Sequence, residues 1–189
     1  MFNKILIANR GEIACRIIST CQKLGIQSVA IYSSADKDAL HTRLADEAFE
    51  IGEAEASLSY LNQDSLLRLA TTQGVDAIHP GYGFLSENSE FVQKCEQSGI
   101  SFIGPTAPVI EQMGNKIKAR QIAIDAGVPV IPGSEDAVRD SEAAEVAKGI
   151  GFPIMVKASG GGGGIGMSVA NDVDELHEAL RKSRSLAQS

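Results

Sequence analysis

Short apolar runs recur along the first half of the chain and predict buried strands. They cover residues 4–8, 28–32, 48–51, 75–79 and 100–103. Helical periodicity fills the intervals between them, as over residues 60–72, and a polar loop is expected over 33–38. In the first interval Ile13, Ile17, Cys21 and Leu24 repeat every three or four positions, and Gly25 follows as a helix stop. Strands that alternate with helices predict βαβ units, so this half is expected to be a doubly wound α/β domain with a parallel sheet.

The second half predicts a separate unit. Helices are expected over 106–113 and 116–126, and the residues 128–133, with Pro129 and Pro132, form an extended connector. After them come a helix over 141–150, strands over 153–157 and 167–170, and a final helix from Asp172. The pattern therefore divides the chain into a domain over 1–113, a linker helix and connector over 114–133, and a thin second unit over 134–189.

The composition indicates which broad classes of protein the chain can belong to. The 189 residues carry 17 basic and 24 acidic side chains, a net charge of −7, and 43% of them are apolar. This is typical of a soluble globular protein and argues against nucleic acid as a partner. No apolar run reaches the length of a membrane span or of a signal-peptide core, and the three cysteines form no CxxC pair. We therefore expect a cytoplasmic protein with reduced thiols and no membrane partner.

Five consecutive glycines stand between the last two predicted strands, in Lys157-Ala-Ser-Gly-Gly-Gly-Gly-Gly-Ile-Gly166. A backbone without side chains lets N–H groups approach an anion, and phosphate is the usual one. The lysine precedes the glycines, so the order is neither that of a P-loop nor that of a dinucleotide fold. We interpret the segment as a flap that closes over phosphates, and the alternative is a tight hairpin with no ligand.

Lys157 itself ends an apolar strand. Period-two alternation places Ile154 and Val156 on one face and Met155 and Lys157 on the other. We expect the lysine face to be half-buried, where a phosphate would compensate the charge; the alternative is a solvated lysine on an edge strand. Lys116 begins its helix, where the helix dipole disfavours a cation. This placement suggests a ligand, and the alternative is a solvated lysine.

Two further motifs follow strand ends, where parallel sheets place ligands. His79-Pro-Gly-Tyr-Gly-Phe-Leu-Ser-Glu-Asn88 supplies polar tips on a backbone shaped by a proline and two glycines. His79 could equally be a half-buried histidine with its hydrogen bonds satisfied. Asn9-Arg-Gly-Glu12 has a single glycine in place of GxGxxG, so nicotinamide binding is not expected. Arg10 and Glu12 are interpreted as structural, paired with each other or with the following loop.

Five motifs in this order closely resemble biotin carboxylase, the ATP-grasp component of biotin-dependent carboxylases. They are Lys4-Ile-Leu-Ile-Ala-Asn-Arg-Gly-Glu-Ile-Ala14, His79 to Asn88, Phe102-Ile-Gly-Pro105, Met113-Gly-Asn-Lys116 and Lys157 to Met167. The resemblance implies a Rossmann-like (pre-ATP-grasp) parallel-sheet domain followed by a partial ATP-grasp lid. It implies a ligase that uses Mg-ATP and bicarbonate to form carboxyphosphate and then carboxylates biotin.

The resemblance also implies roles for particular residues. Lys116 and Lys157 would contact ATP phosphates, with Gly163 and Gly164 in the flap, and Tyr82, Gly83 and Glu87 would lie near biotin. Implied partners are a biotin carboxyl carrier protein or domain, a carboxyltransferase and a second copy of the chain. The catalytic residues and magnesium ligands are expected beyond Ser189, so the chain alone is expected to be inactive.

Two alternatives and one departure accompany this interpretation. The chain could be a truncated, non-catalytic relative that serves as a binding or dimerisation module. It could also be another ATP-grasp ligase, such as a carbamoyl phosphate or purine-pathway enzyme, although those lack the run from His79 to Asn88. Ile165 stands where many members of the resembled family carry arginine or lysine, so one phosphate-facing charge is missing from the flap.

Overall fold

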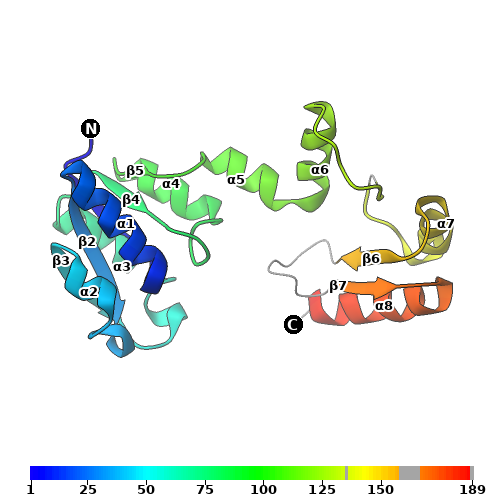
Figure 1. Ribbon diagram of the computed structural model, residues 1–189, viewed down its shortest axis with the longest axis horizontal. Helices are drawn as coiled ribbons and strands as arrows, with labels where there is room; N and C mark the ends of the chain where they lie inside the picture. The colour runs from blue at the N-terminus through cyan, green and yellow to red at the C-terminus, as the bar shows by residue number, and fades with distance from the viewer. Residues whose placement is uncertain (135, 158–166, 188–189) are drawn as a thin grey trace. The chain divides into compact units, whose positions relative to one another are not determined.

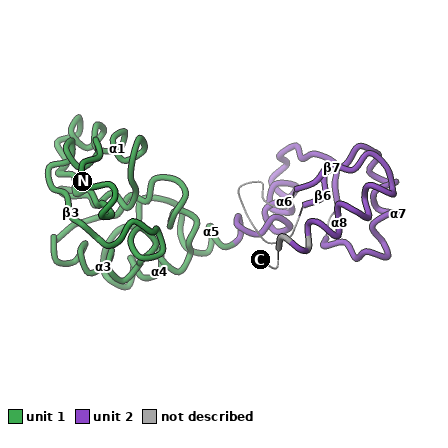
Figure 2. The backbone as a smooth tube through the Cα atoms, turned by 90° about the horizontal axis from the view of Figure 1, so that it is seen from below, with its two compact units in different colours: residues 1–111 green, residues 112–189 purple. Residues whose placement is uncertain are grey.

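The computed structural model describes residues 1–134, 136–157 and 167–187 (Figure 1). The chain divides into two compact units, Met1–Glu111 and Gln112–Ser189 (Figure 2). The division falls inside helix α5 (Ala107–Gly114), just before the boundary expected at Met113. The residues interpreted as a linker, 114–133, belong to the second unit.

The first unit is built on a five-stranded sheet in the order β3-β2-β1-β4-β5. All four neighbouring pairs are parallel, as the alternating pattern predicts. The strand order reverses between β1 and β4, which is the position where doubly wound sheets open a crevice at their carboxyl ends. The strands are β1 (Lys4–Ile7), β2 (Gln27–Ser33), β3 (Glu47–Gly52), β4 (Ala77–His79) and β5 (Ser101–Phe102).

Helices connect these strands and cover both faces of the sheet (Figure 1). Two 3₁₀ turns, Ser34–Asp36 and Ala56–Leu58, follow the ends of β2 and β3. The α-helices are α1 (Gly11–Leu24), α2 (Leu40–Leu44), α3 (Gln63–Thr72) and α4 (Ser89–Gln97).

Alternate residues of β1 enter two different cores. Ile5 and Ile7 pack with the apolar stripe of α1, which includes Ile17 and Cys21. Leu6 faces the opposite side and packs with side chains from α3 and α4. Burial on both faces explains why the predicted strands are continuous apolar runs rather than alternating ones.

After α5, the described residues of the second unit form helices and an antiparallel pair of strands. Met155 lies opposite Val169 and Lys157 lies opposite Met167 in this pair. A small core of alanines and Leu176 joins the strands to α7 and α8. The elements are α6 (Lys116–Asp125), α7 (Asp140–Ile150), β6 (Ile154–Lys157), β7 (Met167–Ala170) and α8 (Val173–Ala187).

Three local predictions differ from the structure. The helix expected from Tyr60 begins at Gln63, because the Asn62 side chain caps it by accepting from the Ser65 N–H. The five-residue helix α2 is absent from the prediction, since it is too short to show periodicity. The pattern over 116–126 predicts an apolar stripe of Ala119, Ile122, Ala123 and Ala126 on α6, but none of the helix's residues is buried in the described part of the chain.

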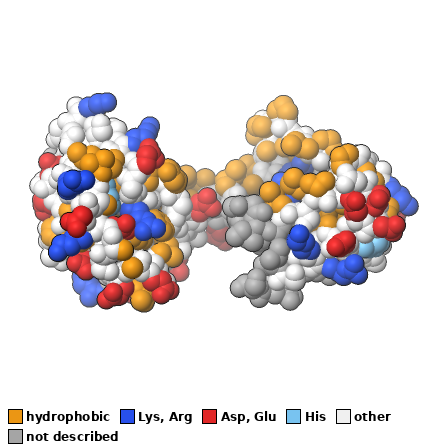
Figure 3. All heavy atoms as spheres, turned by 60° about the horizontal axis from the view of Figure 1, so that its bottom comes forward, with side chains coloured by type: hydrophobic (Ala, Val, Ile, Leu, Met, Phe, Trp, Pro, Cys, Tyr) orange, Lys and Arg blue, Asp and Glu red, His pale blue; other side chains and the backbone are white. Residues whose placement is uncertain are grey.

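Charged side chains of both signs are interspersed on the face shown in Figure 3, in each unit. No helix among the described residues is long and apolar enough to cross a membrane.

Candidate functional site

The carboxyl ends of β1 and β4 meet at the point where the strand order reverses. The Ala8 N–H donates to the His79 carbonyl at 2.9 Å, which extends the pairing of the two strands by one residue. Asn9, which follows, is 4% exposed, and its Nδ2 donates to the carbonyls of Pro80 and Tyr82, each at 2.8 Å. One amide thus joins the chain after β1 to the loop after β4.

His79 shapes the start of this loop. Its Nδ1 accepts from the Gly81 N–H at 3.0 Å, so this nitrogen carries no proton and the ring is neutral. Burial lowers the pKa of His79 from its ordinary value of 6.5, and the positive charge of Arg16 lowers it further. His79 is therefore a half-buried histidine that accepts a hydrogen bond within its own loop, in agreement with the half-buried histidine considered from the sequence.

This arrangement makes the first unit sensitive to mild acid. The folded-state pKa of His79 lies below its unfolded value, so the unfolded chain binds a proton first as the pH falls. The contribution of His79 to stability is therefore present above the ordinary pKa of 6.5 and is expected to be lost as the pH falls below it, toward the lower folded-state pKa. Urea unfolding followed by tyrosine fluorescence measures this decline, and His79→Gln should flatten it. Equal slopes for the two proteins would contradict the assignment.

Tyr82 projects from the same loop and is 63% exposed. Its hydroxyl donates to the Glu12 carboxylate at 3.2 Å, and this hydrogen bond raises the pKa of Tyr82. Glu12 thus pairs with the loop after β4, and Arg10 pairs with Asp36. Of the two alternatives drawn from the sequence, the pairing of Arg10 with Glu12 is therefore not the one that the structure shows. Glu87 is exposed in the same segment, and Gly83 adopts a left-handed conformation, φ +67°.

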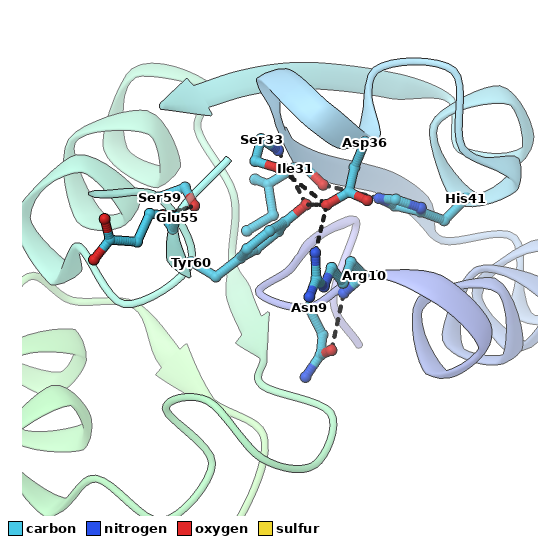
Figure 4. A network of polar contacts seen from close by, with 9 residues as sticks. All are labelled: Asn9, Arg10, Ile31, Ser33, Asp36, His41, Glu55, Ser59 and Tyr60. Carbon is cyan, nitrogen blue, oxygen red and sulfur yellow. Dashed lines mark hydrogen bonds and ion pairs between the residues drawn. The ribbon is translucent and has the colours of Figure 1, made fainter. Parts of the chain in front are cut away.

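Arg10 also belongs to a polar network with Asp36 and Tyr60 (Figure 4). The Phe84 ring stacks on Tyr60 with centroids 5.1 Å apart, and the Arg10 guanidinium lies over both rings. Asp36 Oδ2 accepts from Arg10 at 2.9 Å, from the Tyr60 hydroxyl at 2.7 Å and from the Ser33 hydroxyl at 3.0 Å. The sequence alone assigned Asp36 only to a polar loop and Tyr60 to a helix.

The network holds its ionisable groups in fixed states. Burial by itself raises the pKa of Asp36, but the hydrogen bonds from Tyr60, Arg10 and Ser33 together outweigh it and leave the pKa below the ordinary range. Burial, with the hydrogen bond to Asp36, raises the pKa of Tyr60 to about 12. Near pH 7 the carboxylate is therefore ionised and the phenol neutral, which are the states of a structural anchor and not of an acid–base pair.

The two candidate phosphate-binding lysines lie in the second unit. Lys116 is the first residue of α6, directly after its cap Asn115. Lys157 ends β6 and is exposed, so the half-buried lysine face expected from the sequence is wrong. The buried side of the strand pair is the Ile154 and Val156 side, because α7 and α8 pack there. Lys157 shares the open face with three exposed apolar side chains, Met155, Met167 and Val169.

The remaining sequence-predicted residues divide into two groups. Tyr82, Gly83 and Glu87 lie in one loop of the first unit, as their spacing requires. Gly163, Gly164 and Ile165 lie outside the described residues. Within the described residues, no three His, Cys, Asp or Glu side chains gather closely enough to hold a metal ion.

Comparison with known proteins assigns the first unit. Residues 1–110, more than half of the chain, match the family described as "Biotin carboxylase, N-terminal domain". The chain belongs to the biotin carboxylase family. Residues 115–189 match "Carbamoyl-phosphate synthase L chain, ATP binding domain". The recognition of a biotin carboxylase from the five motifs is therefore confirmed.

Curated relatives align along nearly the whole chain. It is 56% identical over 190 residues to biotin carboxylase of Halalkalibacterium halodurans, covering 100% of this chain and 42% of that protein. It is 53% identical over 188 residues to biotin carboxylase 2 of Bacillus subtilis, covering 99% of this chain and 42% of that protein. The chain thus spans about two fifths of the length of these biotin carboxylase relatives.

Solved biotin carboxylase structures share the fold. A β,γ-ATP complex of the enzyme from Campylobacter jejuni matches with a TM-score of 0.94 and 46% identity, over 100% of this chain and 42% of that one. The biotin carboxylase domain dimer of Hydrogenobacter thermophilus 2-oxoglutarate carboxylase matches with a TM-score of 0.90 and 46% identity, over the same shares. The latter was solved with MgADP, ADP and bicarbonate. The predicted fold class, a Rossmann-like parallel-sheet domain with a small second unit, is confirmed.

Proposed function

We propose that the protein containing this chain is an ATP-dependent biotin carboxylase, which uses Mg-ATP and bicarbonate to carboxylate biotin on a carrier protein. The observation that carries the proposal is the alignment of all 189 residues with biotin carboxylase at 56% identity. The nucleotide and bicarbonate in related structures support the same substrates. Partners of this chain would be the biotin carrier, a carboxyltransferase and a second copy of the chain.

The exposed loop of the first unit is proposed to receive biotin. Tyr82 offers an aromatic face and a hydroxyl that donates to Glu12, and its side chain is largely exposed. Gly83 leaves the adjacent backbone uncovered, and Glu87 adds a carboxylate in the same segment. Biotin has an apolar ring system with a polar urea edge. The aromatic surface of Tyr82 can contact the apolar part, and the uncovered backbone can hydrogen-bond the urea.

The second unit is proposed to hold the nucleotide. Lys157 presents its ammonium group on the open face of the strand pair, next to apolar side chains, and Lys116 adds a second cation at the start of α6. Catalysis of phosphoryl transfer consists mainly of positioning and of cations that stabilise the developing phosphate charge. Gly163 and Gly164 are proposed to complete this phosphate site. The metal ligands are proposed to lie in a part of the protein outside this chain.

Turnover by the protein that contains this chain tests the proposal. Labelled bicarbonate should enter free biotin, with ATP hydrolysis dependent on both substrates, and the 189-residue chain alone should give none. Lys157→Gln should raise the KM for ATP at least about tenfold, since one charge-assisted contact to phosphate is lost. Lys148→Gln removes another exposed lysine of the same unit and should leave KM unchanged.

Three results would contradict this function. ATP hydrolysis that biotin does not stimulate would favour a different ATP-grasp ligase. Nucleotide binding without any turnover would favour a non-catalytic binding module. Equal KM values for ATP in the Lys157→Gln and Lys148→Gln proteins would remove Lys157 from the nucleotide site.

A further inference from the structure

The crevice between β1 and β4 is filled by a side chain of the protein itself. In open parallel sheets, ligands bind beyond the carboxyl ends of the strands where the strand order reverses. Here Asn9 occupies that position and is 4% exposed. The usual ligand crevice of the fold is therefore used for an internal contact.

The side-chain amide of Asn9 uses both of its donor hydrogens and its oxygen in hydrogen bonds to the two chain segments beside it. Both Nδ2 hydrogens are donated, one to the Pro80 carbonyl and one to the Tyr82 carbonyl, each at 2.8 Å. Its Oδ1 accepts from the Arg10 N–H at 2.9 Å, at the start of α1. Two donors on carbonyls two residues apart fix the direction of the peptide groups between them, which a single hydrogen bond cannot do.

The loop is shaped to fit this amide. Gly81 has φ +68°, and a Cβ at that position would lie 2.8 Å from Asn9 Nδ2 and 3.1 Å from Asn9 Cβ. At its far end the loop is held by Phe84, which stacks on Tyr60 and lies under the Arg10 guanidinium. The backbone is thus held at both ends, with Tyr82 and Gly83 between the two anchors.

The part of the loop between the anchors is open. Tyr82 is 63% exposed, and among the described residues none accepts from the N–H of Tyr82 or of Gly83. Backbone donors that are held rigidly and left without a protein acceptor are available to a ligand carbonyl at little entropic cost.

We propose that Asn9 is a positioning residue for biotin: from the crevice between β1 and β4 it holds the 80–84 loop in the shape that binds the ureido ring. Asn9 itself does not touch the substrate. The inference rests on the proposed function, because it assigns biotin to this loop.

The experiment compares three variants of the full-length protein. Asn9→Ala removes both donors, and Asn9→Asp keeps the shape but places carboxylate oxygens against two carbonyls. Asn62→Ala is the matched control, since it removes an asparagine that caps α3 and leaves the loop contacts intact. Both Asn9 variants should raise the KM for biotin about tenfold more than the KM for ATP, while Asn62→Ala changes the two KM values equally.

Amide hydrogen exchange supplies a readout that needs no activity. The Gly81 N–H donates to His79 and the Ser86 N–H donates to the Gly83 carbonyl, so both report the shape of the loop. Exchange at both should be faster in the Asn9 variants than in Asn62→Ala. If the unaltered protein carboxylates biotin but the Asn9 variants show an unchanged KM ratio, the inference is wrong and the proposed function stands. If the unaltered protein does not carboxylate biotin, the proposed function fails, and the role of Asn9 toward biotin fails with it.

Discussion

Replacing Gly52 by alanine is expected to lower the unfolding free energy of the first unit by about 3–5 kcal/mol. Gly52 ends β3 with φ +150°, and an added Cβ would lie 2.0 Å from the backbone oxygen of Leu58. Backbone cannot rotate away as a side chain can, so the turn after β3 must shift. The strained conformation adds to the clash, because residues with a side chain rarely adopt this φ.

Gly74→Ala separates these two contributions. Gly74 also has a positive φ, +60°, but a Cβ there would meet nothing within 4 Å. Only the conformational term of about 1–2 kcal/mol remains. Urea unfolding can be followed by tyrosine fluorescence, which reports the first unit alone because the chain has no tryptophan and its three tyrosines lie before residue 112. Equal losses at the two positions would show that the turn after β3 yields without strain.

Asp36→Ala is expected to destabilise the first unit by about 2–4 kcal/mol. The carboxylate accepts from Arg10, Tyr60 and Ser33, and its removal leaves a buried phenol without its acceptor and a guanidinium without its counter-charge. Asp64→Ala is the control: Asp64 is largely exposed and lies 3.7 Å from Lys94, so its loss should change stability by less than about 0.5 kcal/mol. If Asp36→Ala lowers the unfolding free energy no more than Asp64→Ala does, water must replace the hydrogen bonds that the Asp36 carboxylate accepts.

The dependence of stability on pH tests the role of Asp36 independently. The folded-state pKa of Asp36 is lowered, so its contribution is complete above the unfolded value of 3.8 and is lost as the pH falls through the folded value. The unaltered chain should therefore lose more stability than Asp36→Ala below about pH 4. Parallel acid profiles for the two proteins would contradict the assignment.

The sheet of the first unit could be predicted because its strands are buried on both faces. Ile5 and Leu6 enter different cores, so the sequence shows a plain apolar run that needs no partner to be recognised. Tyr60 shows the opposite case. Its position next to a helical pattern favours a helix, but its place is decided by contacts with Asp36 and Phe84, which lie 24 residues away on either side. A local sequence pattern cannot predict contacts between residues so far apart in the chain.

The candidate site divides in the same way. The loop with Tyr82 and Gly83 could be located because it follows a strand, and parallel strands end at a common edge. Asn9 follows a strand too, but nothing in its neighbours distinguishes a buried amide with three hydrogen bonds from an exposed turn residue. The pairing of Glu12 with Tyr82 needs the three-dimensional distance between two strand ends, which spacing along the chain does not give.

The orientation of Lys157 could not be predicted for a related reason. Alternation correctly separates Ile154 and Val156 from Met155 and Lys157, but it does not say which pair faces α7 and α8. With three apolar residues among the four, both faces qualify as the buried one. The structure selects the face, and it leaves the lysine exposed.

The central strand of the first unit has a consequence for how that unit comes apart. β1 is hydrogen-bonded on both edges, to β2 and to β4, and its successive side chains anchor α1 on one side and α3 with α4 on the other. The helices on one face cannot unfold while β1 keeps its packing on that face. β1 cannot leave the sheet without the loss of packing on both faces. Residues 1–111 should therefore melt as a single cooperative block, with no partly folded species that retains one layer.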